Sequence, residues 1–76
     1  MTRQEANHYY RCLSRRFGDA VQLVQVKVGV WAIGLNGALY DCSRTLHSAF
    51  ESESMLFDEA AFKLPRYRAQ EGLSLL

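Results

Sequence analysis

The sequence lacks most of the features that mark the common classes of small protein. Its 76 residues include only two cysteines, Cys12 and Cys42, too few for a disulfide framework and without the C-x-x-C spacing of a redox motif or zinc knuckle. No window approaches the roughly 18 apolar residues of a membrane span, and the first ten residues are polar where a signal peptide is apolar. We therefore expect free thiols and a cytoplasmic protein with no membrane partner.

The sequence also lacks a large excess of positive or negative charge. Nine basic and eight acidic residues give a net charge of +1, so no overall field draws the chain onto nucleic acid or an anionic membrane. The charges are nevertheless segregated, because residues 1–27 carry five basic and two acidic side chains whereas residues 51–59 carry four acidic ones. This segregation predicts complementary charged patches.

No catalytic signature is present either. The segment GLNG at residues 34–37 lacks the lysine and the length of a phosphate-binding loop, and the sequence contains no G-x-S-x-G. A chain this small also has little room for an enclosed pocket. We expect a protein that is not an enzyme and has no cofactor, with a metal-dependent or thiol enzyme as the least favoured alternative.

A zinc site would have to use both histidines and both cysteines. His8 and Cys12 belong to the first predicted helix, and Cys42 and His47 follow the predicted hairpin. Zinc accepts such a set of ligands. His8 and Cys12 lie on or beside the polar side of their helix, however, while the opposite side must face the sheet that carries Cys42. The four ligands are not expected to converge in one subunit, and we predict no metal site.

What the sequence does contain begins with an amphipathic helix. Thr2 and Glu5 have the spacing of a capping box, and Gly18 follows the last periodic residue, where helices commonly end. At 100° per residue the apolar side chains fall in one arc, comprising Ala6, Tyr9, Tyr10, Leu13 and Phe17. The opposite arc holds Gln4, His8, Arg11 and Arg15.

A valine-rich stretch from residue 20 to residue 35 predicts a strand. Asn36 and Gly37 supply the two positive-φ positions of a tight hairpin turn, after which residues 38–43 return. A two-residue loop would pair Leu35 with Ala38, Ile33 with Tyr40 and Trp31 with Cys42.

Gly29 leaves two arrangements of this strand open. Unbroken alternation would place Trp31, Ile33 and Tyr40 on one face with Gln25 and Lys27, and would leave Trp31 largely outside. A bulge at Gly29 would instead align Trp31, Ile33 and Tyr40 with Val24, Val26 and Val28. We predict the bulge, because it separates polar from apolar side chains more cleanly.

The C-terminal part has helical periodicity up to Pro65. Ser43 can cap a helix that contains Leu46, Ala49 and Phe50, and Ser54 can cap a second segment that ends at Leu64. One continuous helix is the alternative. Residues 66–76 follow Pro65 and are expected to be an ordered tail only if something docks them.

These elements predict a small single-domain α+β fold spanning residues 1–65, with an N-terminal amphipathic helix, an antiparallel β-hairpin and then one or two helices. A two-stranded ribbon has two exposed edges. A third strand from the tail, or pairing between two subunits in a homodimer, would cover one of them.

The favoured function is a small protein-interaction module, either an adaptor or an inhibitor, that docks on a larger intracellular protein or complex. Short inhibitors of host defence encoded by phages and other mobile elements have this general build, which is an analogy of size alone. Arginine and aromatic residues are enriched at binding hot spots, and the predicted partner-binding residues are Arg11, Arg15, Arg16, Trp31, Tyr40, Arg66, Tyr67 and Arg68. Nucleic-acid binding through the basic helix face and the RYR segment at residues 66–68 is the alternative.

Overall fold

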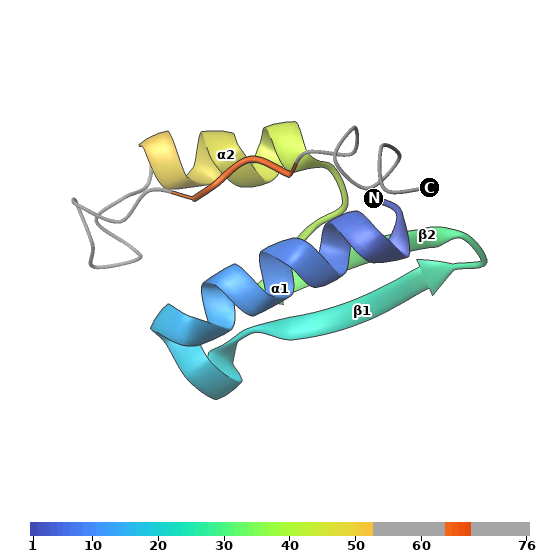
Figure 1. The fold of residues 1–76 in the computed structure, drawn as a ribbon, viewed down its shortest axis with the longest axis horizontal. Helices are drawn as coiled ribbons and strands as arrows, with labels where there is room; N and C mark the ends of the chain where they lie inside the picture. The colour runs from blue at the N-terminus through green and yellow to red at the C-terminus, as the bar shows by residue number, and fades with distance from the viewer. Residues whose placement is uncertain (53–63, 68–76) are drawn as a thin grey trace, which may run out of the picture.

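The first element of the computed structural model is helix α1, Arg3–Phe17, which begins and ends where the sequence predicts (Figure 1). The Thr2 hydroxyl accepts a hydrogen bond from the Glu5 backbone N–H at 3.1 Å, and Gly18 follows the helix with a φ of +58°. Ala6, Tyr9 and Leu13 form the buried side of α1. The structure describes residues 1–52 and 64–67.

A three-stranded antiparallel sheet follows a short 3-10 helix at Gly18–Ala20. Its strands are β1, Gln22–Lys27, β2, Val30–Leu35, and β3, Ala38–Tyr40, in the spatial order β1-β2-β3. The single long strand predicted for residues 20–35 is therefore wrong. The chain turns at Val28 and Gly29, and Gly29 takes a φ of +79°, so that β1 supplies the third strand.

The predicted bulge at Gly29 and its apolar face are also wrong. A bulge is present, but it lies in β1 between Gln25 and Lys27. Gln25 pairs with Trp31 and Leu23 pairs with Ile33, so these four side chains lie on one face of the sheet, because directly paired residues share a face. Val24 pairs with Ala32 on the opposite face. Trp31 and Ile33 thus share their face with Gln25, as in the rejected alternative.

The second turn confirms the prediction for Asn36 and Gly37, whose φ values are +54° and +78°. Leu35 pairs with Ala38 and Ile33 with Tyr40, as expected. Trp31 does not pair with Cys42, because β3 ends at Tyr40. The N-terminal residue lies beside Trp31 instead, where the Trp31 N–H donates to the Met1 carbonyl at 2.8 Å and the Met1 amino group donates to the Trp31 carbonyl at 3.1 Å.

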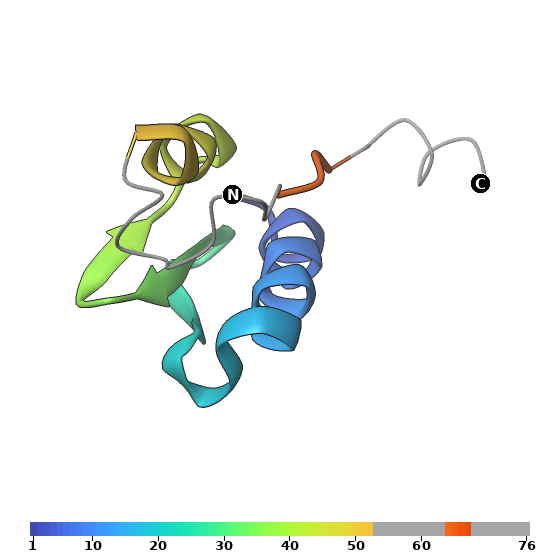
Figure 2. The same cartoon turned by 90° about the vertical axis from the view of Figure 1, so that its left-hand side faces the viewer.

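Helix α2, Ser43–Ser52, completes the described fold. Ser43 is its first residue rather than its cap, and α2 contains Leu46, Ala49 and Phe50, which are buried. Both helices lie on the same side of the sheet (Figure 2), and one core cluster joins α1, α2 and the sheet residues Ile33 and Leu35. Neither α-helix of the described ranges is long and apolar enough to cross a bilayer.

The segment Leu64–Tyr67 returns to this core. Leu64 is only 8% exposed and belongs to the core cluster, and Tyr67 packs against it. The second helix predicted from Ser54, and the choice between one helix and two, lie outside the described residues. So does the tail from residue 68 onward, including Arg68.

Candidate functional site

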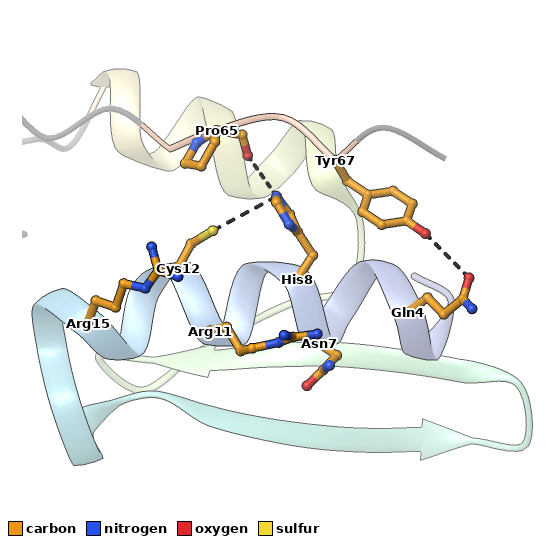
Figure 3. A pocket seen from close by; sticks show the side chains of 8 residues that line it. All are labelled: Gln4, Asn7, His8, Arg11, Cys12, Arg15, Pro65 and Tyr67. Atoms are coloured by element: carbon orange, nitrogen blue, oxygen red, sulfur yellow. Dashed lines mark hydrogen bonds between the residues drawn. The ribbon is translucent and has the colours of Figure 1, made fainter. Parts of the chain in front are cut away.

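A hollow of about 570 Å³ lies between the outer side of α1 and the segment Leu64–Tyr67, which we call the strap (Figure 3). We call this feature the basic hollow. Its described lining residues are Gln4, Asn7, His8, Arg11, Cys12, Arg15, Pro65 and Tyr67. Helical spacing brings the α1 residues into one stripe, because positions three and four apart are neighbours on a helix surface.

Hydrogen bonds hold the strap against α1. The Tyr67 N–H donates to the Tyr9 hydroxyl at 3.1 Å, and the Tyr67 hydroxyl donates to Gln4 Oε1 at 3.4 Å. His8 Nε2 lies 3.3 Å from the Pro65 carbonyl oxygen. Together with the buried Leu64 side chain, these contacts give the basic hollow a fixed second wall.

The Tyr9 hydroxyl connects the strap to α2. Its oxygen accepts from the Tyr67 N–H and lies 3.2 Å from His47 Nε2. The arrangement that satisfies every group has the Tyr9 O–H donating to Nε2, since the ring nitrogen can accept and the hydroxyl has one proton to give. Tyr9 is 1% exposed, so an unpaired hydroxyl at this position would be costly.

The electrostatics of the basic hollow favour an anionic ligand. Its described lining contains Arg11 and Arg15 and no acidic residue. Neither guanidinium makes a hydrogen bond or an ion pair with another described residue, and both side chains are exposed. Arginine presents a planar fork of donors that matches carboxylate and phosphate oxygens. Beside the polar side chains of Gln4 and Asn7, the hollow therefore offers two guanidinium groups that have no partner in the part of the chain that the structure describes.

Cys12 and His8 do not form an activated nucleophile in this arrangement. His8 Nε2 is 3.9 Å from Cys12 Sγ and 3.3 Å from the Pro65 oxygen. A carbonyl can only accept, so Nε2 must carry a proton to bond it and has no lone pair left to take the proton of the thiol. Burial raises the pKa of Cys12, an effect that the positive charges of Arg15 and Arg11 only partly offset. A raised pKa keeps the less reactive thiol form.

The four residues that a zinc site would have to use lie in different parts of the structure. His8 and Cys12 line the basic hollow, whereas His47 contacts the buried Tyr9 hydroxyl. Cys42 is exposed just before α2, and both cysteines are free thiols. Within residues 1–52 and 64–67, no group of three or more histidine, cysteine or acidic side chains could hold a metal ion.

The structure separates the predicted partner-binding residues. Arg11, Arg15 and Tyr67 line the basic hollow, and Arg66 is exposed on the strap. Arg16 is exposed near the end of α1 and has an interaction partner. The two remaining described residues that were predicted to bind a partner, Trp31 and Tyr40, lie on the sheet.

Trp31 and Tyr40 lie away from the basic hollow. Both are half-buried and pack against the core. The Arg3 guanidinium lies 5.5 Å from the centre of the Trp31 ring, a cation–π distance. Trp31 therefore holds the N-terminal segment beside the sheet, through the contact of its ring with Arg3 and through its backbone hydrogen bonds to Met1.

Sequence reasoning missed several wall residues of the basic hollow. Gln4 and His8 fall on the same arc of the predicted helix as Arg11 and Arg15, so helical spacing indicates that these side chains are neighbours. Pro65 gave no such signal, because its contact with His8 spans 57 positions in the sequence. No family model, curated protein or solved structure matches the chain.

Proposed function

We propose that this protein is a protein-interaction module, an adaptor or inhibitor, that docks on a larger protein by inserting an acidic segment of that partner into the basic hollow. The observation that supports the proposal is the pair of guanidinium groups of Arg11 and Arg15, which have no ion-pair partner among the described residues and lie in a hollow whose described lining is free of acidic side chains. The cytoplasm, where free thiols such as Cys12 and Cys42 persist, is the compartment we propose.

Several features favour a protein over a nucleic acid as the partner. Proteins that bind DNA through its backbone commonly neutralise about 6 to 10 phosphates, whereas the basic hollow holds two arginines and the strap adds Arg66. The tyrosine ring that lines the hollow with these arginines is that of Tyr67, which packs beside His8 at a ring distance of 5.5 Å and is hydrogen-bonded to Gln4. That ring is engaged within the protein rather than presented for base stacking.

Affinity capture from host extract with paired variants tests this function. The double variant Arg11→Glu/Arg15→Glu reverses the charge of the hollow, and Arg44→Glu reverses an exposed charge on α2 as a matched control. We expect the wild type and the control to retain the same partner and the double variant to lose it. Capture of that partner by all three proteins, or recovery of nucleic acid in place of a protein, would contradict the proposal.

A further inference from the structure

We propose that the group which the basic hollow recognises is a phosphomonoester carried by a side chain of the partner's acidic segment. This inference rests on the proposed function, because it names the chemical group of the partner that enters the hollow. The charge of the hollow, the point at which its two arginines act and its free hydrogen-bond donors all favour a phosphomonoester over a carboxylate.

The positive charge of the hollow matches the negative charge of one phosphomonoester. Arg11 and Arg15 are one helical turn apart, have no ion-pair partner among the described residues, and share a lining without a described acidic side chain. A phosphorylated side chain carries a charge of about −1.5 to −2 at neutral pH, so a single group can balance both guanidinium groups. A carboxylate carries one negative charge, as does each phosphate of a nucleic acid, and would leave one arginine uncompensated.

Both guanidinium groups act on the same point of the hollow. Burial raises the pKa of the Cys12 thiol, and the positive charges of Arg15 and Arg11 each oppose that effect. Because Coulomb interactions weaken with distance, both charges lie within reach of this one thiol. Both arginine side chains are exposed, so their forks can close on one tetrahedral group seated beside Cys12.

The hollow has free neutral donors, whereas two of its acceptor oxygens are occupied. The Tyr67 hydroxyl donates to Gln4 Oε1 at 3.4 Å, and Gln4 Nε2 makes no hydrogen bond with another described residue. The Pro65 carbonyl oxygen is occupied by His8 Nε2 at 3.3 Å. Asn7 also lines the hollow and makes no hydrogen bond with another described residue. Phosphate has three acceptor oxygens, so it can use more of these donors than a carboxylate with two.

The size of the hollow suits a phosphorylated side chain together with its neighbours. Its volume is about 570 Å³, within the range of about 300–1,000 Å³ that ligand pockets occupy, and a free phosphate ion would fill only a small part of it. The strap closes one side and is fixed to α1 by the hydrogen bonds of Tyr9 and His8. The remaining volume can hold the side chain and the adjoining backbone of a peptide.

Calorimetric titration of the full chain with three matched peptides tests the proposed ligand. The peptides share an uncharged sequence and differ at one position, which is phosphoserine, glutamate or serine. We expect the phosphoserine peptide to bind several-fold more tightly than the glutamate peptide. Arg11→Gln/Arg15→Gln, folded by circular dichroism, should lose this preference, and the control Arg44→Gln on α2 should keep it. Equal binding of the phosphoserine and glutamate peptides, no binding of the phosphoserine peptide, or tighter binding of a single-stranded oligonucleotide of the same length would overturn the proposal.

The Cys12 thiol reports where the phosphate lies. A dianion between Arg11 and Arg15 cancels the positive charges that lower the pKa of Cys12, so the bound phosphoserine peptide should slow alkylation of Cys12 by iodoacetamide. The exposed Cys42 is the control in the same sample. Binding of the phosphoserine peptide without slower reaction at Cys12 would place the phosphate elsewhere and overturn the proposal.

Phosphatase treatment of the host extract separates failure of this proposal from failure of the proposed function. We expect the wild-type protein to capture its partner from untreated extract and to lose it from treated extract. A partner that is captured equally after phosphatase treatment, but is lost with Arg11→Glu/Arg15→Glu, would overturn the phosphomonoester and leave acidic docking in place. A partner that the double variant retains would overturn both.

Discussion

Tyr9 shows how one residue can serve the core and the candidate site together. Its ring is buried with Leu13 on the inner side of α1, while its hydroxyl bonds to the Tyr67 N–H and to His47 Nε2. Helical periodicity placed Tyr9 in the core, but no sequence pattern indicates that a buried tyrosine hydroxyl joins α2 to a strap 58 positions away. The position requires tyrosine rather than phenylalanine because of those two partners.

Removal of this hydroxyl should weaken the strap. Tyr9→Phe keeps the ring but removes the acceptor of the Tyr67 N–H and the hydroxyl that bonds to His47 Nε2, so the free energy of unfolding should fall by about 1–3 kcal/mol. Tyr10→Phe is the matched control, because Tyr10 is half-buried and makes no hydrogen bond with another described residue. Urea denaturation of the three proteins measures the difference. Equal stability of the two variants would show that the Tyr9 hydroxyl holds nothing in place.

The reactivity of the two thiols should differ at mildly alkaline pH. Burial raises the pKa of Cys12, so a smaller fraction is thiolate, and Cys12 should react more slowly with iodoacetamide than the exposed Cys42. Arg15→Gln removes a positive charge that lowers this pKa, so it should slow Cys12 further.

Peptide mapping after timed alkylation, repeated across a pH series, measures both rates in one sample. We expect the rate profile for Cys12 to move to higher pH in Arg15→Gln. Faster reaction at Cys12, or an accelerating effect of Arg15→Gln, would show that the electrostatic description of the basic hollow is wrong.

At the scale of elements, local signals predicted α1 and the Asn36–Gly37 turn. Both depend on residues that are close in the sequence. The N-terminus of α1 is capped by the Thr2 hydroxyl, three positions from the Glu5 N–H. The turn needs only the positive φ values of Asn36 and Gly37. The turn at Val28 and Gly29 escaped prediction because valine favours strands, so Gly29 was assigned to a bulge. The pairing of β1 with β2 outweighed the strand preference of Val28, which lies in the turn.

The conformation of Gly29 gives this turn a direct test. Its φ is +79°, and a methyl group there would meet no atom within 4 Å, so Gly29→Ala should destabilise through backbone strain alone, by about 1–2 kcal/mol. Gly29→Asn should cost less, because asparagine enters the left-handed region more readily. Thermal unfolding compares the two variants. A continuous strand through Gly29 would instead make alanine at least as well tolerated as asparagine.

At the scale of the whole molecule, the basic hollow is built from two segments that lie far apart in the sequence. The basic hollow lies between α1 and the strap (Figure 3). The arginines of the hollow could be found from helical spacing. Its second wall could not, because the strap reaches α1 through contacts across more than fifty positions of sequence.

The affinity of the purified partner for wild-type protein and for Arg11→Glu/Arg15→Glu tests the central claim most directly. Titration calorimetry at two salt concentrations should show binding that weakens with salt for the wild type. Like charges set against each other at an interface cost several kcal/mol, so the double variant, folded by circular dichroism, should lose at least about tenfold in affinity, the equivalent of 1.4 kcal/mol. Unchanged affinity and unchanged salt dependence in the folded double variant would contradict the assignment of the basic hollow as the docking surface.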